Sequence, residues 1–375
     1  MYFTLVEYQA RLERARAVMH ARQLDVLLLF GQEAVNYLSG FYSHGHFAGI
    51  VLGIPAHGEP FLILRQMEKV AAQETTWVQS RYVYNDHEHA LDYTAKALAD
   101  RALLNARIAA DTHSWYLTAD RYMRLLELLP HATLEPTGDF LDYMRTVKSE
   151  AELVKVRRAG QSVTAAMTAA LQATRVGVSE NDIAAEMAAA RIRSGGGLPI
   201  DGVVTTGPRT LQGHGPWTER VVQADDPFYY EVHGICDHYW TRSIRSGVVG
   251  MPTDRQRDTF DLMLEAQDLA VNAIKPGASA REVDRLCRDR LIEGGLYKRD
   301  TFTRRTGYGM GLMFRPTPGD LFFEFTRAAD FELQEGMVFM MLCLAEGLGI
   351  GDTLEVTASG AEFVTKVPRC FHTGG

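Results

Sequence analysis

The sequence predicts a chain of two domains, an α/β domain followed by an α+β domain. With 375 residues, the chain is long enough for two hydrophobic cores of ordinary size. Up to about Leu141, helix-patterned and strand-patterned segments alternate, which is typical of an α/β domain with a mixed sheet. Beyond that point long helices predominate, and short strands fill the region from Thr306 to Val367. This second pattern favours helices packed outside a curved antiparallel sheet.

The first part of the chain begins with apolar residues at helical spacing over residues 5–22, which predicts an amphipathic helix. Strands are expected at Val26–Phe30, Ala48–Ile54 and Phe61–Leu64. His44 and His46 lie in a glycine-containing loop between the first two strands. Histidines in such loops are usually solvated, but loops also carry binding residues, so His46 is a candidate substrate contact.

A domain boundary is expected near residues 145–149, which gives predicted domains of 1–144 and 145–375. At Ser149-x-x-Glu152 a long helix should begin, because this serine and glutamate can satisfy each other's free backbone amides. The same reasoning predicts helices that begin at Ser179-x-x-Asp182, Thr253-x-x-Gln256 and Ser279-x-x-Glu282.

The most informative stretch runs from Glu231 to Ser246 and predicts two short strands joined by a polar turn at residues 234–237. Side chains alternate across a strand, so Glu231 and His233 share a face, as do Trp240 and Arg242. A hairpin would place a carboxylate, an imidazole and a guanidinium on one wall. Buried charge is costly unless it is paired, so this wall is a candidate functional site. An exposed face with an ordinary surface ion pair is the alternative.

The composition, with 46% hydrophobic and 23% charged residues, is that of a soluble globular protein. The net charge of −8 is spread out and no basic cluster occurs, so neither nucleic acid nor a membrane is an expected partner. No apolar run is long enough to span a bilayer, and the N-terminus lacks the pattern of a signal peptide. The four cysteines form no CxxC pair, which fits a cytoplasmic protein without a disulfide scaffold.

Five motifs resemble those of the creatinase/aminopeptidase P/prolidase superfamily, in order and spacing, over nearly the whole chain. They are Arg145–Glu152, Ile274–Gly277, Gly307–Gly309, Glu335–Val338 and Asp352–Val356. The resemblance implies a creatinase-type N-terminal domain, a C-terminal "pita-bread" catalytic domain and a homodimer. It specifies function less well than fold, because one fold can carry several activities.

The peptidases of this superfamily hold two metal ions at five positions, which the resemblance places on Glu231, Arg242, Tyr308, Leu342 and Gly351. Only Glu231 is an ordinary ligand for a hard divalent cation. Arg242 would repel the metal ions. The sequence therefore predicts no dinuclear metal site and no cofactor.

Residues 212–219, which include His214 and Trp217, resemble the segment that carries the catalytic histidine of creatinase and the His-x-x-Trp-Thr segment of ectoine hydrolases. The resemblance implies a metal-independent hydrolase of a C–N bond in a cyclic amidine, amide or amidino group. The substrate would be a small metabolite that carries a carboxylate. A lyase or decarboxylase on the same scaffold, or a binding protein with a decayed metallopeptidase site, remains open.

Two residues are the candidate catalytic groups. His214 is the expected general acid/base, because imidazole titrates near neutral pH. Aromatic neighbours are expected to raise the pKa of Glu231, which would then act as a base or as a nucleophile. Its rival role is a salt bridge to Arg242 or Arg245 that only holds the hairpin together.

Arg242 is the main candidate for binding a substrate carboxylate, because its planar fork can donate two parallel hydrogen bonds. Tyr308 could donate a hydrogen bond to the substrate or serve only the core. Arg315 could be a second contact to an anion or an exposed surface residue. The full set of candidate substrate-binding residues is Trp217, His233, Tyr239, Trp240, Arg242, Tyr308, Met310, Arg315, Leu342 and His46.

Overall fold

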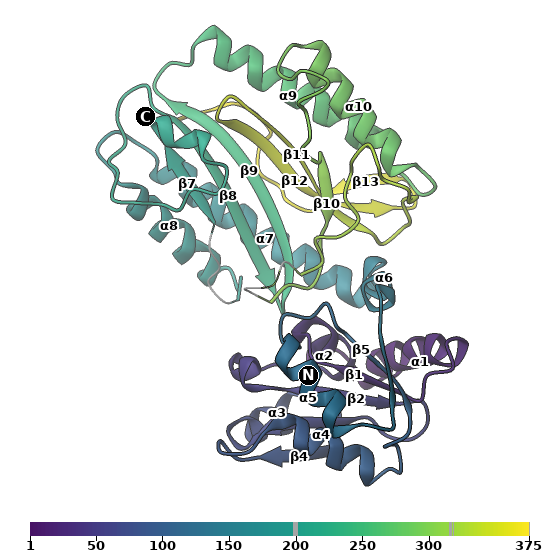
Figure 1. The fold of residues 1–375 in the computed structure, drawn as a ribbon. Helices are drawn as coiled ribbons and strands as arrows, with labels where there is room; N and C mark the ends of the chain where they lie inside the picture. Colours follow the sequence, from purple (N-terminus) through teal and green to yellow (C-terminus); the bar gives the residue numbers. More distant parts are fainter. Residues whose placement is uncertain (198–201, 315–316, 318, 375) are drawn as a thin grey trace. The chain divides into compact units, whose positions relative to one another are not determined.

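The computed structural model describes residues 1–197, 202–314, 317 and 319–374 (Figure 1). Two compact units make up the chain, one of Met1–Met144 with Phe314–Thr317 and one of Arg145–Met313 with Pro318–Gly375. Within the described residues, no helix combines the length and apolar character needed to cross a membrane.

The first unit is an α/β domain, as predicted, built on a six-stranded mixed sheet in the order β4-β3-β2-β1-β5-β6. Strand β1 pairs antiparallel with β2 and parallel with β5. The strands are β1 (Val26–Leu29), β2 (Val51–Pro55), β3 (Phe61–Arg65), β4 (Ser80–Tyr84), β5 (Arg107–Ala110) and β6 (Thr133–Pro136). The helices are α1 (Leu5–Ala21), α2 (Gln32–Ser39), α3 (Lys69–Thr75), α4 (Ala90–Ala99), α5 (Ala119–Leu128) and α6 (Phe140–Thr146), with short 3₁₀ turns η1 (His44–Ala48) and η2 (Gln66–Glu68).

The segment before β2 differs from the prediction, because His44–Ala48 forms the 3₁₀ turn η1 and the strand begins only at Val51. Ser43 caps this turn by accepting a hydrogen bond from the amide of Gly45. His46 is buried, and its Nε2 lies 2.7 Å from the carbonyl oxygen of Phe30. Desolvation lowers the pKa of His46 to about 4. The expectation that this histidine is solvated was wrong, and its contacts are those of a neutral core residue.

The second unit is built on an eight-stranded, mainly antiparallel sheet in the order β10-β11-β12-β9-β8-β7, with β13 and β14 added to β12 and β9. Its strands are β7 (Val203–Thr206), β8 (Pro227–Cys236), β9 (Tyr239–Val249), β10 (Gly307–Gly309), β11 (Val338–Ala345), β12 (Leu348–Thr357), β13 (Gly360–Phe363) and β14 (His372–Gly374). Its helices are α7 (Glu150–Ala173), α8 (Glu180–Arg193), α9 (Asp254–Ala273) and α10 (Ala280–Glu293), and η3 (Gly207–Leu211) is a 3₁₀ turn.

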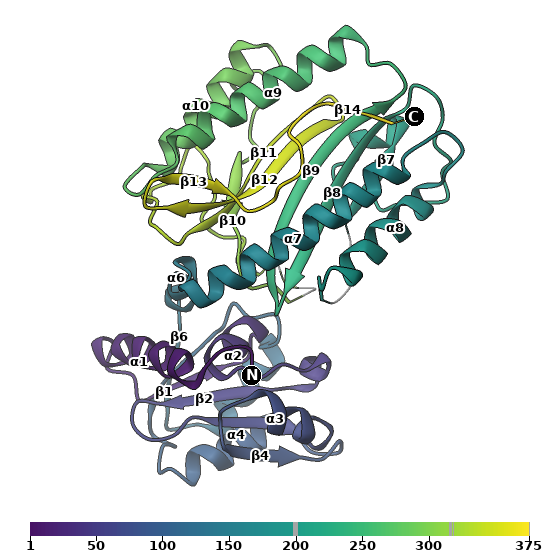
Figure 2. The same ribbon diagram turned by 180° about the vertical axis from the view of Figure 1, so that it is seen from behind.

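Helices cover the sheet of the second unit as two pairs (Figure 2). Helix α7 contacts β8 and β9, and α8 contacts β7, around a core that includes Met167, Met187 and Tyr230. Helix α9 contacts β11 and β12 around a second core that includes Phe260 and Phe339. Helices outside a curved antiparallel sheet confirm the predicted fold class.

The predicted helix starts are confirmed. Ser149, Ser179 and Thr253 each form a reciprocal capping box with the residue three positions later. Ser279 also precedes a helix, but its side chain makes no cap hydrogen bond. Its backbone instead forms an isolated bridge with Glu332.

The central hairpin has the predicted faces but not the predicted turn. Strands β8 and β9 are longer than expected, and the turn lies at Asp237 and His238, which have φ angles of 47° and 69°. Gly234 lies within β8. The position requires glycine because a Cβ atom there would come within 2.4 Å of the Ala159 carbonyl oxygen of α7. In the observed register His233 pairs with Arg242. Both are buried, which excludes the exposed-face alternative.

Candidate active site

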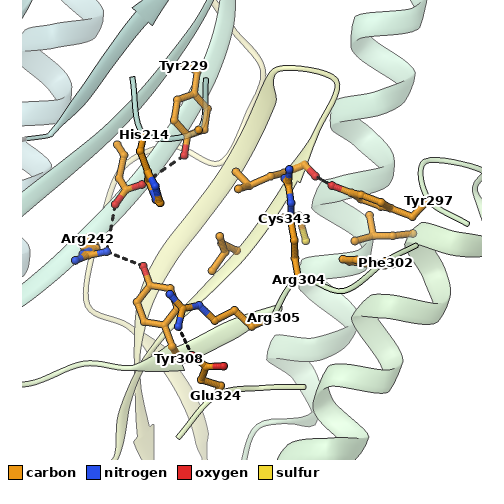
Figure 3. A pocket seen from close by; sticks show the side chains of 15 residues that line it. His214, Tyr229, Arg242, Tyr297, Phe302, Arg304, Arg305, Tyr308, Glu324 and Cys343 are labelled. Carbon is orange, nitrogen blue, oxygen red and sulfur yellow. Dashed lines mark hydrogen bonds and ion pairs between the residues drawn. The ribbon is translucent and has the colours of Figure 1, made fainter. Parts of the chain in front are cut away.

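A pocket of about 550 Å³ lies in the second unit, and all of its lining residues belong to that unit. Figure 3 shows His214, Tyr229 and Arg242 at one side and Tyr297 and Phe302 at the other. Of the predicted site residues, five line this pocket: His214, Glu231, Arg242, Tyr308 and Leu342. The hairpin therefore forms part of a cavity wall.

Glu231 is the centre of a buried hydrogen-bonded group. Its Oε1 lies 2.8 Å from His233 Nε2 and 3.3 Å from Arg242 Nη1. The same Arg242 nitrogen donates to the Tyr308 hydroxyl over 2.9 Å. The hydroxyl of Tyr229 lies at the limit of hydrogen bonding to the other oxygen of Glu231, at 3.5 Å. The carboxylate is thus neutralised by the protein's own guanidinium.

The acidity of Glu231 is opposite to the expectation. Burial alone would raise its pKa, but the hydrogen bond with His233 and the charge of Arg242 outweigh burial and lower the pKa to about 2. The predicted raised pKa was wrong, because the residues in contact with the carboxylate are charged or hydrogen-bonding rather than only aromatic. Glu231 is therefore ionised at neutral pH.

His214 lies on an exposed loop that is anchored at both ends by one buried side chain, Glu180 of α8. One oxygen of Glu180 accepts hydrogen bonds from the amide and hydroxyl of Thr206, at 2.8 and 3.0 Å. The other accepts from the amide and hydroxyl of Thr218, at 3.0 and 2.8 Å. Arg209 also pairs with this carboxylate, at 3.3 Å. This clamp fixes the two ends of the loop that carries His214.

The five positions inferred for metal ligands do come together across neighbouring strands. Ile244 of β9 pairs with Glu231 on one side and with Gly351 on the other, and Gly351 pairs with Leu342. Yet the side chains do not suit two divalent cations, since a guanidinium contacts the single carboxylate of the set. Among the described residues, no three His, Cys, Asp or Glu side chains are grouped so that they could hold a metal ion.

Some predicted substrate contacts do not line the pocket. The hydroxyl of Tyr239 donates to Glu152 of α7 over 2.7 Å, because alternation turns this side chain to the opposite face of β9 from Arg242. Trp217 packs against the core beneath α7 and α8. His233 contacts Glu231, and its ring centroid lies 5.6 Å from that of Trp240, but neither residue lines the pocket.

The remaining predicted contacts lie outside this pocket or outside the described residues. Met310 is buried, and its amide donates to the carbonyl of Val338. His46 belongs to the first unit. Arg315 lies outside the described residues, so its predicted role stays a prediction.

The far side of the pocket was not predicted from the sequence; it is lined by Arg304, Arg305, Glu324, Tyr297 and Phe302. One signal is present in the sequence, since Arg304 and Arg305 closely precede the Gly307–Gly309 motif. Nothing in the sequence near Leu291 or Tyr297 indicates that α10 and the loop after it reach this cavity.

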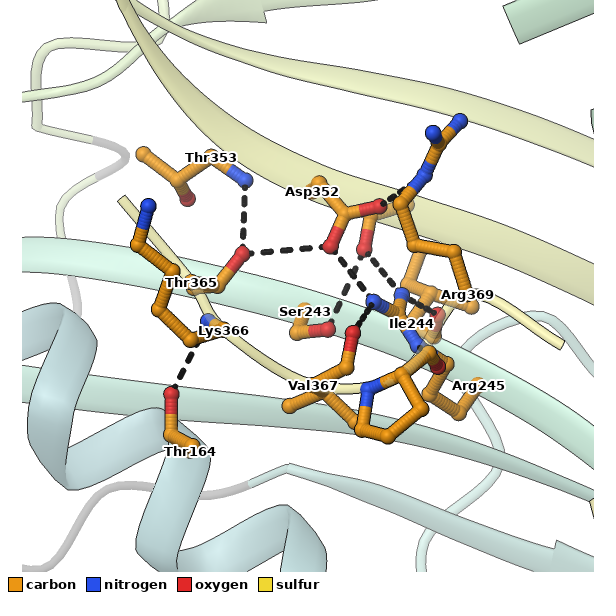
Figure 4. Close-up of polar contacts among 12 residues, drawn as sticks. Thr164, Ser243, Ile244, Arg245, Asp352, Thr353, Thr365, Lys366, Val367 and Arg369 are labelled. Carbon is orange, nitrogen blue, oxygen red and sulfur yellow. Dashed lines mark hydrogen bonds and ion pairs between the residues drawn. The ribbon is translucent and has the colours of Figure 1, made fainter. Parts of the chain in front are cut away.

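Arg245 of β9 has a structural role and pairs with Asp352 rather than with Glu231 (Figure 4). It is fully buried and pairs with Asp352 of β12 at 2.6 Å. It also donates to the backbone carbonyls of Val367 and Pro368. Because these contacts lie on the face of β9 away from Arg242, Arg245 ties the sheet together and does not reach the pocket.

Comparisons with known proteins agree with this architecture. Residues 154–358 match the model of metallopeptidase family M24, and residues 11–147 match the creatinase/prolidase N-terminal domain. The ectoine hydrolase of Halomonas elongata is 24% identical over 98% of this chain and 97% of its own. An uncharacterized hydrolase/peptidase of Sinorhizobium fredii is 26% identical over 98% of both chains.

Among solved structures, the dipeptidase PepE of Mycobacterium ulcerans superposes with a TM-score of 0.84 at 25% identity, over 99% of both chains. The Xaa-Pro dipeptidase of Bacillus anthracis gives the same TM-score at 24% identity, over 98% of this chain and 99% of its own. The family match covers more than half of the chain, and the relatives are hydrolases and peptidases. The chain therefore belongs to metallopeptidase family M24, with a creatinase/prolidase N-terminal domain before its M24 domain.

Proposed function

We propose that this protein hydrolyses a C–N bond in a small carboxylate-bearing molecule without a metal ion. The observation that carries the proposal is the contact of Arg242 with Glu231 and Tyr308. In the dinuclear peptidases these three positions would serve the metal ions, whereas here a permanent cation joins them. The similarity to ectoine hydrolase over nearly the whole chain supports a C–N hydrolase of the ectoine-hydrolase type.

His214 is the proton carrier in this proposal. It lines the pocket from an exposed loop, so it can exchange protons with solvent and with a bound substrate. Hydrolysis adds the hydroxyl of water to the amide or amidine carbon and a proton to the leaving nitrogen. A histidine can take the proton from water and then return it to nitrogen, because its pKa lies near neutral pH in ordinary surroundings.

Glu231 is better suited to act as an ionised carboxylate than to carry a proton. A group with a pKa of about 2 takes up protons poorly at neutral pH. Its negative charge can instead stabilise a cationic amidinium. Alternatively, one of its carboxylate oxygens can attack the reacting carbon as a nucleophile. Tyr308, whose hydroxyl accepts the hydrogen bond from Arg242, lines the same wall.

The test combines metal analysis with turnover in the presence and absence of a chelator, on ectoine, N-acetyl-diaminobutyrate, creatine and Xaa-Pro dipeptides. We expect chelator-insensitive hydrolysis that His214→Ala lowers by about 10²–10⁴-fold without a change in thermal stability, since general acid–base catalysis contributes that much. Products that contain oxygen from labelled water separate hydrolysis from a lyase or decarboxylase. Chelator-sensitive cleavage of dipeptides by a protein that holds two metal ions would overturn the proposal. Absence of metal and of turnover would instead favour a binding protein.

A further inference from the structure

The pocket continues well beyond the group around Glu231. Its far side is lined by Leu291, Tyr297, Phe302, Cys343 and Leu344, from α10, the segment after it and β11. The rings of Tyr297 and Phe302 stack with centroids 4.1 Å apart and planes at 14°. Cavities of about 300–1,000 Å³ hold drug-sized ligands, so a compact metabolite bound at Glu231 would leave this apolar side unfilled.

The permanent charges of the lining do not cancel. The pocket is lined by three guanidiniums and two carboxylates. Arg242 pairs with Glu231, and Arg305 pairs with Glu324. Among the described residues, Arg304 has no carboxylate partner, so it leaves the lining with a net charge of one positive unit.

Arg304 lies between the two sides of the pocket in Figure 3. It is near the hydroxyl of Tyr297: burial raises the pKa of Tyr297, and the adjacent Arg304 guanidinium partly offsets that rise. An arginine beside an aromatic stack can donate two hydrogen bonds to a carboxylate while apolar atoms of the ligand cover the rings.

We infer that Arg304 and the Tyr297–Phe302 stack form a second subsite, which binds the carboxylate and an adjoining apolar group of an elongated monoanionic substrate. This inference rests on the proposed function and deepens it, because it assigns the substrate carboxylate to Arg304 rather than to Arg242. The charge of Arg242 is already paired with Glu231, and its Nη1 donates to both Glu231 and Tyr308. A substrate that spans the pocket would present its C–N bond to His214 and Glu231 and its acid group to Arg304.

The test measures binding by calorimetry with two probes of equal shape, 4-phenylbutyrate and its neutral amide 4-phenylbutanamide. We expect the wild-type protein to prefer the carboxylate, and Arg304→Gln to weaken carboxylate binding about tenfold while the amide changes little. Arg304→Lys should restore part of the preference. Arg327→Gln is the matched control, because it removes the same charge from an exposed arginine outside the pocket. Circular dichroism establishes that each variant is folded.

An unchanged preference for the carboxylate in Arg304→Gln would overturn the inference, and so would the failure of the wild-type protein to bind either probe at millimolar concentration. Phe302→Ala should weaken the binding of both probes. If both probes bind wild type and Phe302→Ala equally well, the apolar part of the subsite is refuted. None of these readouts depends on turnover. Chelator-sensitive peptidase activity would therefore refute the proposed function alone, whereas loss of the Arg304 effect would refute the subsite alone.

Discussion

Arg242→Met tests the buried ion pair directly, because methionine keeps much of the side-chain volume and removes the charge. The ordinary pKa of 4.5 for Glu231 falls to about 2 in the folded protein. At about 1.4 kcal/mol per pKa unit, the ionised carboxylate is stabilised by about 3 kcal/mol relative to the unfolded chain. His233 contributes to this stabilisation and remains in the variant, so we assign about 2 kcal/mol to Arg242. The Tyr308 hydroxyl also loses its donor, which costs about 1 kcal/mol.

We therefore expect Arg242→Met to lower the free energy of unfolding by about 3 kcal/mol at pH 7, within the range for breaking a buried pair. The loss should depend on pH with a definite sign. A depressed pKa stabilises the folded state above the unfolded value of 4.5, and this contribution disappears as the pH falls toward 2. The difference between wild type and variant should thus narrow from pH 7 to pH 3.

Urea unfolding at pH 7 and pH 3 measures both the loss of stability in Arg242→Met and its dependence on pH. Arg327→Met serves as the control for loss of a surface arginine, and it should shift stability by less than about 0.5 kcal/mol. In the double variant with Glu231→Gln, the two losses should not add, since the residues are in contact. A loss below about 1 kcal/mol, or an equal loss at pH 7 and pH 3, would refute the reasoning from the ion pair.

Two further predictions concern the loop clamp and the thiols. Glu180→Gln should lower kcat at least about tenfold and lower the free energy of unfolding by about 2 kcal/mol. The reason is that the neutral amide cannot accept all the hydrogen bonds that the carboxylate accepts. An unchanged kcat, measured at saturating substrate, would contradict the role of the clamp. In the native protein, iodoacetamide should label the exposed Cys370 but not Cys287 or Cys343, whose sulfurs lie 3.4 Å apart in the core. The hydrogen bond with Cys343, followed by burial, raises the pKa of Cys287 well above its ordinary value. Mass spectrometry of peptides would reveal any labelling of the buried pair.

The fold could be predicted from the sequence because its signals are local. Each capping box involves residues three positions apart, so Ser149 and Glu152 indicate a helix start without any tertiary information. The hairpin likewise follows from alternation along adjacent strands, which predicts Glu231, His233 and Arg242 on one wall, as observed. The turn was predicted at the wrong residues because glycine is typical of turns. Gly234 is instead needed within β8, where a side chain would collide with the backbone of α7, a segment far away in the sequence.

The acidity and orientation of site residues could not be predicted in the same way. For Glu231, burial and hydrogen bonding act in opposite directions, and their balance depends on distances that no sequence pattern gives. Tyr239 was expected among the substrate contacts, but it stands three residues before Arg242 in β9, so the two side chains point to opposite faces of the strand. The pocket arginines illustrate the same limit. Arg304 and Arg305 are adjacent and chemically identical, yet Glu324, from another segment, pairs with Arg305 and not with Arg304.

In the proposed function, the arrangement of charge in this pocket separates two tasks that a dinuclear metal site would perform together. Metal ions both polarise the reacting group and attract anionic substrates. Here Arg242 donates hydrogen bonds to Glu231 and Tyr308, so its charge keeps the carboxylate of Glu231 ionised and in place. A proposed acidic substrate would then be attracted by another cation, and among the described lining residues Arg304 is the guanidinium that no carboxylate neutralises. On this proposal, the guanidinium of Arg242 at a metal-ligand position and the arginine without a carboxylate partner across the cavity act together on one substrate.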